Sequence, residues 1–339
     1  MQDAKFNDKK RLCLCGNAGE DMRITIMGAG GVGGYFGAKL AKSGCEVNFV
    51  ARGAHLAALR QNGLRVESQL GEIYLPEVRA GDDPAVFGRP DYVFLCVKLW
   101  DTEAAVRALE KVRAPHTAVL SFQNGVQKDD LLRKMLGGRA VMGGVAYIGA
   151  GIARPGVIRH TGTIQRLVFG EFDGSRSERA AALLEACARA GIDGEISADV
   201  RRAIWEKFVF IVGLSALTTA TRRTIGPVRA NPRTRALLLE IMKETVAVGR
   251  AQGVNLPEDF AEKRLAFVDS LPAEMTSSMH NDLEAGKRLE LDWLSGGVVE
   301  LGKAANVPTP MNGAVSAILA LDANGSETSP PRAAARQGP

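Results

Sequence analysis

The leading candidate for a catalytic residue is a lysine at the start of a long apolar run. Lys207 precedes residues 208–217, which read F-V-F-I-V-G-L-S-A-L. Ile211 and Ser215 follow it at four and eight residues, so all three share one face of a predicted helix. A lysine in this setting usually extends its ammonium to solvent. The alternative is a partly desolvated ammonium with a lowered pKa, which is a good proton donor to a ketone.

A glycine-rich stretch fits G-x-G-x-x-G and could bind the pyrophosphate of a dinucleotide. Gly28 permits a tight turn, Gly30 lets backbone approach the pyrophosphate, and Gly33 lets a helix pack closely on a strand. The motif alone is weak, but an apolar strand at 24–27 precedes it, a helix follows, and a second strand is predicted at 46–50. The predicted cofactor-binding residues here are Gly28, Ala29, Gly30, Gly31, Val32 and Gly33.

Polar residues follow three predicted strands at the edge where ligands of open α/β sheets bind. Arg52 comes after the second strand, where an NAD-specific site would place a carboxylate. Its guanidinium suits a 2′-phosphate, and the alternative is a solvated surface arginine. Lys98 and Asn124 follow the ends of the strands predicted at 91–97 and 117–122. Each could equally be an ordinary loop residue with no role in binding. Glu290 would otherwise be an ordinary carboxylate at a helix start.

The predicted elements fall into two domains. Strands and helices alternate up to a helix at 177–190, with short antiparallel strands within 141–168, which predicts an α/β Rossmann-type domain over residues 22–195. From residue 199 nearly everything has helical spacing, with helices expected at 201–221, 232–253, 257–270, 292–305 and 312–321. We therefore expect an all-α domain over residues 196–322. Residues 1–21 and 323–339 are predicted to be a disordered leader and tail.

Composition excludes several classes of function. The 339 residues are 46% hydrophobic and 24% charged, with a formal charge of +5. The sequence has no stripe of basic residues interleaved with aromatic ones, so we do not expect it to bind nucleic acid. The five cysteines are an odd number and the four histidines are scattered, so we expect no metal site and a cytoplasmic protein. The apolar core of the long helix is too short for a membrane span.

Several short motifs occur together and in order: Gly28 to Gly33, Lys98, Q-N-G at 123–125, W-E-K at 205–207, S-S-M at 277–279 and L-E-L-D at 289–292. The set resembles the ketopantoate reductase family (2-dehydropantoate 2-reductase) over about residues 22–321. The resemblance implies a Rossmann domain followed by a helical domain, an active site in the cleft between them, and NADPH as the hydride donor. The expected binding partner is a small 2-oxo acid substrate. A homodimer is compatible with the resemblance.

The resemblance also implies roles for single residues. Arg52 and Lys98 would lie near the adenosine phosphate, Asn124 near the nicotinamide end, and the Gly149 backbone against the cofactor. Lys207 matches the catalytic proton donor, Glu290 the active-site carboxylate, and Ser278 a contact to the substrate carboxylate. These assignments belong to the family and are carried over position by position.

The chain departs from the family at Ile211 and Ser215, where relatives carry asparagines that bind substrate. An isoleucine cannot form a hydrogen bond, and a polar substrate group left unpaired loses affinity. We therefore expect either reduction of ketopantoate for pantothenate biosynthesis or reduction of a less polar 2-oxo acid by the same mechanism. An NADPH-binding sensor with little turnover is the alternative from another class, although it would need neither Lys207 nor Glu290.

Overall fold

The structure is a computed structural model that describes residues 22–325. The predicted leader, and all but the first three residues of the predicted tail, lie outside this range. The chain forms two compact units, and both take pieces from several parts of the sequence. Of the described residues, the first unit comprises 22–97, 104–122 and 136–198, and the second comprises 98–103, 123–135 and 199–325.

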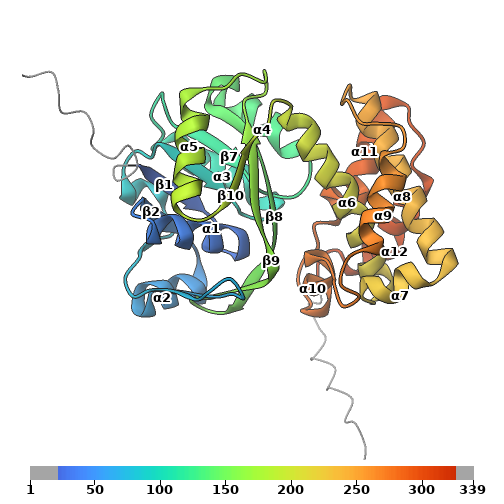
Figure 1. Cartoon of the computed structure of the whole chain (residues 1–339), viewed down its shortest axis with the longest axis horizontal. Helices are drawn as coiled ribbons and strands as arrows, with labels where there is room; N and C mark the ends of the chain where they lie inside the picture. The colour runs from blue at the N-terminus through green and yellow to red at the C-terminus, as the bar shows by residue number, and fades with distance from the viewer. Residues whose placement is uncertain (1–21, 326–339) are drawn as a thin grey trace, which may run out of the picture. The chain divides into compact units, whose positions relative to one another are not determined.

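The first unit is built on one ten-stranded sheet of order β4-β3-β9-β8-β7-β6-β1-β2-β5, with β10 paired to β9. The neighbours from β8 through β7, β6, β1 and β2 to β5 are all parallel, whereas β8 and β9 form the long antiparallel hairpin in Figure 1. The strands are β1 (Arg23–Met27), β2 (Glu46–Val50), β3 (Leu64–Glu67), β4 (Ile73–Leu75), β5 (Arg79–Gly81), β6 (Tyr92–Leu95), β7 (Ala118–Ser121), β8 (Val141–Arg154), β9 (Val157–Gly170) and β10 (Asp193–Ile196).

Buried apolar side chains explain why these segments form a parallel sheet. Ile24, Ile26, Phe49 and Phe94 are all fully buried, as expected for strands covered on both faces. The helices that begin in the neighbouring connections are α1 (Gly31–Lys42), α2 (Gly53–Asn62), α3 (Thr102–Glu110), α4 (Gln127–Leu136) and α5 (Glu178–Arg189), and short 3₁₀ turns lie at η1 (Pro84–Phe87), η2 (Leu99–Asp101) and η3 (Gly138–Ala140). The Rossmann-type fold class is thus confirmed.

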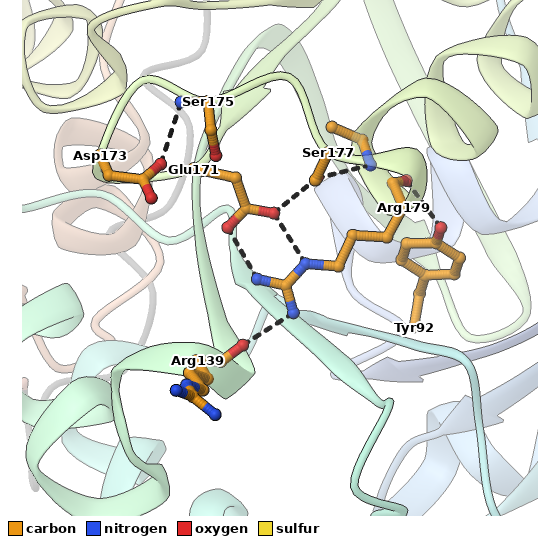
Figure 2. Close-up of polar contacts among 8 residues, drawn as sticks. Tyr92, Arg139, Glu171, Asp173, Ser175, Ser177 and Arg179 are labelled. Atoms are coloured by element: carbon orange, nitrogen blue, oxygen red, sulfur yellow. Dashed lines mark hydrogen bonds and ion pairs between the residues drawn. The ribbon is translucent and has the colours of Figure 1, made fainter.

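A partly buried ion pair fixes the loop between β9 and α5. Figure 2 shows Arg179 donating two hydrogen bonds of 2.7 Å to the Glu171 carboxylate, which also accepts one of 2.6 Å from Ser177. Arg179 also binds the Arg139 carbonyl, and its own carbonyl accepts from the Tyr92 hydroxyl. Burial favours the neutral acid, but these donors hold the pKa of Glu171 below its usual value. The contacts are satisfied within the unit, so we interpret this cluster as structural.

The second unit is helical, which confirms the expectation of an all-α part after residue 199. The long helix α6 contacts α7, α8, α9, α10 and α12, and Asp199 caps its first turn by accepting from the Arg202 N–H at 3.0 Å. The helices, yellow to red in Figure 1, are α6 (Val200–Thr221), α7 (Ile225–Ala230), α8 (Pro232–Ala251), α9 (Phe260–Asp269), α10 (Ser278–Glu284), α11 (Ser295–Ala305) and α12 (Pro310–Leu319), with 3₁₀ turns η4 (Leu291–Trp293) and η5 (Ala320–Asp322).

Helix α6 is long and apolar enough by composition to cross a membrane. Two-thirds of its most apolar window (67%) is nevertheless buried inside the protein. The helix is amply covered by its neighbours, as the core helix of a globular domain would be.

Some predicted boundaries were wrong. The helix expected at 257–270 begins only at Phe260. The helix expected at 292–305 is divided at Leu294, whose backbone angles are not helical, so a 3₁₀ turn precedes α11. The antiparallel strands within 141–168 are confirmed, but they extend to Gly170 and continue the same sheet. The segments that became α2, α4, α7 and α10 were not predicted to be helices.

Candidate functional site

The glycine-rich turn between β1 and α1 requires glycine for two separate reasons. Gly28 has a φ of +101°, and a Cβ there would lie 2.7 Å from the backbone nitrogen of Val97. A Cβ on Gly33 would lie 2.3 Å from the Gly28 carbonyl oxygen and 2.6 Å from the Ile26 side chain. The first glycine thus permits the turn and the last lets α1 pack on β1, as the motif predicts.

The N-terminus of α1 suits an anionic ligand. Its N-cap residue is Gly30, which has no side chain to occupy the free N–H groups, and the first turn of the helix holds no acidic residue. A Cβ on Gly30 would meet no atom within 4 Å, so the backbone there borders open space. Free N–H groups and the helix dipole in open space fit the pyrophosphate of a dinucleotide.

His55 on α2 holds the glycine-rich turn in place. Gly156, in the turn between β8 and β9, donates its N–H to Nδ1 at 3.1 Å, so the proton of the neutral ring is on Nε2. Nε2 then donates to the Ala29 carbonyl at 2.8 Å. Burial lowers the pKa of His55, although the bond to Ala29 opposes that shift. The neutral ring therefore joins three segments of the first unit by two hydrogen bonds.

The remaining predicted cofactor residues of the first unit lie at its surface. Arg52 is exposed and is the N-cap residue of α2, two residues after β2 ends. Gly149 is exposed in β8 opposite Thr161, where the β8–β9 register shifts. Both placements agree with access to a ligand, and their roles stay predictions.

Lys207 lies in the second unit and donates a hydrogen bond of 2.9 Å to the side-chain oxygen of Asn124. Its pKa is lowered to about 7, first by burial of the ammonium, next by the positive charge of Lys128, and against the opposing pull of Glu290. An amine with this pKa is about half protonated at neutral pH, so it can both hold a proton and release it, which suits a general acid.

Lys128 and Asp129 form a buried ion pair at the start of α4. The Lys128 ammonium donates to the two carboxylate oxygens of Asp129 at 3.0 and 2.9 Å, and the side chains are 1% and 7% exposed. Burial raises the pKa of Asp129 despite this lysine. The pair places a second cation in the electrostatic surroundings of Lys207.

Glu290 is buried and accepts hydrogen bonds from two groups near the start of η2. One carboxylate oxygen accepts from the Leu99 N–H at 3.1 Å and the other from the Lys98 ammonium at 3.4 Å. Lys98 also donates to Asp282 on α10 at 2.6 Å. Burial alone would lower the pKa of Lys98, but the two carboxylates outweigh it and raise that pKa. Within the second unit, Lys98 therefore accompanies the predicted catalytic carboxylate.

The predicted substrate residues differ in their accessibility. Ile211 is half-buried, one turn after Lys207, whereas Ser215 is fully buried and its hydroxyl has no partner among residues 22–325. Ser278 is exposed and is the first residue of α10. The helix is anchored through its N-cap residue Ser277, which contacts the Thr218 hydroxyl at 3.0 Å. All of these residues belong to the second unit. Substrate contact stays a prediction for Ile211, Ser215 and Ser278, and likewise for Lys207.

Sequence reasoning missed several residues of this region. Asp282 gave the weak signal of lying four residues after Ser278, which places both on one helical face. Lys128 and His55 gave none, because their partners are chosen by the tertiary fold. Trp100 and Trp293, with Arg288, were also not singled out.

In the part of the chain that the structure describes, no group of three or more His, Cys, Asp or Glu residues could hold a metal ion. The first unit holds a glycine-rich turn on a Rossmann-type sheet, and the second holds a lysine with a lowered pKa. Both are features expected of an oxidoreductase that uses a dinucleotide.

Comparison with known proteins identifies the family. The model "Ketopantoate reductase PanE/ApbA" matches residues 24–174, and its C-terminal counterpart matches residues 199–322. A 2-dehydropantoate 2-reductase of Mesorhizobium japonicum is 34% identical over 321 residues, covering 88% of this chain and 96% of the relative. A PanE/ApbA family ketopantoate reductase structure from Ralstonia eutropha is 36% identical with a TM-score of 0.81, covering 89% and 98% of the two chains.

The chain belongs to the ketopantoate reductase family and is an oxidoreductase of that type. A D-mandelate dehydrogenase solved with NADH and anilino(oxo)acetate shares the fold, with a TM-score of 0.81 at 22% identity. The recognition made from the motifs is confirmed.

Proposed function

We propose that the protein is an NADPH-dependent reductase that converts ketopantoate to pantoate in the cytoplasm, as part of pantothenate biosynthesis. The observation that carries this proposal is the half-buried Lys207, bonded to Asn124 and with a pKa lowered to about 7. Relatives named 2-dehydropantoate 2-reductase, at 31–34% identity, support the choice of substrate. A homodimer is compatible with this role and is part of the proposal.

NADPH, when bound, supplies a hydride to the keto carbon of the substrate. The residues of the chain manage the charge and the proton. Lys207 donates its proton to the alkoxide oxygen that forms, and its positive charge stabilises that oxygen while the charge develops. Asn124 holds the Lys207 ammonium at 2.9 Å and so fixes the direction of the donated proton. Glu290 favours the protonated lysine through its negative charge.

The cofactor assignment rests on Arg52. An exposed guanidinium two residues after β2 suits the 2′-phosphate of NADPH, whereas a site for NADH would favour a carboxylate there. The glycine-rich turn would hold the pyrophosphate of either nucleotide. We therefore propose a preference for NADPH.

A second candidate substrate follows from Ile211. Its half-buried apolar side chain lies one turn from Lys207 and offers no hydrogen bond to a polar substrate group. A 2-oxo acid with an alkyl group at that position would bury apolar surface instead. The same chemistry with a less polar acid is therefore the alternative.

The test is NADPH oxidation by the wild-type protein and by Lys207→Ala, measured across a panel of 2-oxo acids that includes ketopantoate and 2-oxoisovalerate. We expect turnover by the wild type and a loss of roughly 10²–10⁴-fold in Lys207→Ala, with NADPH binding retained. Binding of NADPH without oxidation for any acid would indicate a sensor. Near-normal turnover in Lys207→Ala would show that this lysine only packs.

A further inference from the structure

An exposed arginine in the second unit lies against two indole rings. The Arg288 guanidinium lies 4.7 Å from the centre of the Trp100 ring and 5.8 Å from that of Trp293. The two indole rings are themselves 6.1 Å apart at 52°. We call these three residues the indole–guanidinium cluster. Stacking on aromatic rings limits the orientations of a guanidinium and leaves its N–H edges free to bind a planar anion.

The cluster adjoins the residues assigned to catalysis. The Lys98 ammonium lies 5.8 Å from the centre of the same Trp100 ring, and it contacts Glu290 at 3.4 Å. Arg288 precedes Glu290 by two residues in the sequence, and Trp293 ends the 3₁₀ turn that follows it. The guanidinium thus shares an aromatic neighbour with a lysine that touches the predicted active-site carboxylate.

A count of charges shows why Arg288 differs from the lysines of this region. Lys98 faces two carboxylates, those of Glu290 and Asp282, and Lys128 faces the carboxylate of Asp129. The charge of Lys207 varies near neutral pH, because its pKa is about 7. Within the described residues Arg288 makes neither a hydrogen bond nor an ion pair, and its side chain is exposed. It is therefore the permanent cation of this group that lacks a compensating carboxylate in the part of the chain described.

Both molecules of the proposed reaction are anions. A 2-oxo acid carries a carboxylate at neutral pH, and NADPH carries several phosphate charges. Ser278, the contact to the substrate carboxylate that the family implies, is a neutral hydroxyl and brings no charge. Arginine binds carboxylate and phosphate in the same two-pronged geometry, so either could be its ligand.

We infer that Arg288 is an anion-binding residue of this site, which takes a carboxylate or phosphate oxygen on the free edge of its guanidinium while Trp100 and Trp293 fix its plane. This inference rests on the proposed function, because that function supplies the two anions. The alternative is an arginine that only covers the two indoles, which would leave ligand binding unchanged when its charge is removed.

The experiment titrates three variants and the wild type with each ligand separately, by calorimetry and by the change in tryptophan fluorescence. The ligands are oxamate, an unreactive analogue of a 2-oxo acid, and NADPH. The variants are Arg288→Met, which keeps the aliphatic stem, Arg288→Lys, which keeps only the charge, and Arg233→Met. The last is the matched control, because Arg233 on α8 is also exposed and makes no side-chain hydrogen bond or ion pair within residues 22–325.

We expect Arg288→Met to raise the Kd of oxamate about tenfold, as for the loss of one screened charge-assisted contact, with Arg288→Lys in between and Arg233→Met unchanged. A weakened binding of NADPH instead would assign the phosphate as the ligand and would also support the anion site. Unchanged binding of both ligands in Arg288→Met would overturn the inference while leaving the reductase intact. A wild type that binds NADPH but reduces no 2-oxo acid would instead overturn the proposed function.

Discussion

Replacing Lys128 by methionine should raise the pH above which the enzyme loses activity. Lys207 must carry a proton to donate one, so with a pKa of about 7 its activity is complete below that pH and falls about tenfold for each unit above it. The positive charge of Lys128 is the second cause of the lowered pKa, after burial. Without it the protonated form of Lys207 is favoured.

The size of the shift follows from the kind of interaction removed. One nearby charge moves a partly buried pKa by about one to three units. We therefore expect the breakpoint of the pH profile to rise by at least about one unit in Lys128→Met. At a pH between the two breakpoints, the variant should retain a larger share of its maximal activity than the wild type does.

The assay is kcat/KM for the 2-oxo acid at saturating NADPH, measured from about pH 6 to about pH 9. The double variant Lys128→Met/Asp129→Asn is the matched control, because it removes the same cation without leaving a buried carboxylate unpaired. Its breakpoint should match that of Lys128→Met, since Lys128 and not Asp129 lowers the pKa of Lys207. Circular dichroism and NADPH binding verify that both variants fold.

Two results would refute this reasoning. A wild-type profile that stays flat up to about pH 9 would mean that Lys207 has an ordinary lysine pKa or does not donate the proton. An unchanged breakpoint in Lys128→Met would mean that burial alone sets the pKa of Lys207.

Three further outcomes are expected. Arg52→Ala should weaken NADPH binding by about 1.5–3 kcal/mol and leave NADH binding unchanged in calorimetry, whereas equal losses would exclude contact with the 2′-phosphate. Ile211→Asn should raise kcat/KM for ketopantoate relative to 2-oxoisovalerate by up to about a hundredfold, and a neutral result would place Ile211 away from the substrate. Gly31→Ala should lower the Tm, because its Cβ would lie 2.2 Å from the Ala150 carbonyl oxygen. The Cβ of Gly30→Ala would meet no atom within 4 Å, so this variant should weaken cofactor binding and keep the wild-type Tm. Equal Tm losses in the two variants would contradict this expectation.

The sequence predicted the fold well where periodicity and burial agree. The apolar strand at 24–27 and the glycine-rich turn after it are confirmed, because the chain has few other ways to bury β-branched residues beside a helix. The helix α6 was equally clear, since it is apolar around most of its circumference. Helix α4 was missed because its polar residues outnumber its apolar ones, and α10 because it is only seven residues long.

The sequence allowed the residues of the site to be predicted, but not the contacts between their side chains. The types of Lys207 and Glu290 indicated their chemistry, and the resemblance to a family suggested their roles. Their partners depend on long-range contacts: Lys207 meets Asn124, 83 residues away, and Lys98 meets Asp282, 184 residues away. No local pattern contains such pairings. For the ion pair of Lys98 with two carboxylates, the only signal in the sequence was the weak one of Asp282 lying four residues after Ser278.

The division of the second unit among three stretches of chain bears on how the protein is made. Residues 98–103 and 123–135 leave the ribosome long before residues 199–325, which make up the described remainder of their unit. The Leu99 N–H donates to the carboxylate of Glu290, which is synthesised 191 residues later, and the partner of Lys98, Asp282, is synthesised 184 residues after it. During synthesis these early segments are therefore without their permanent neighbours. A chain that ended at residue 198 would therefore keep residues 98–103 and 123–135 but lack the helices with which they form the second unit.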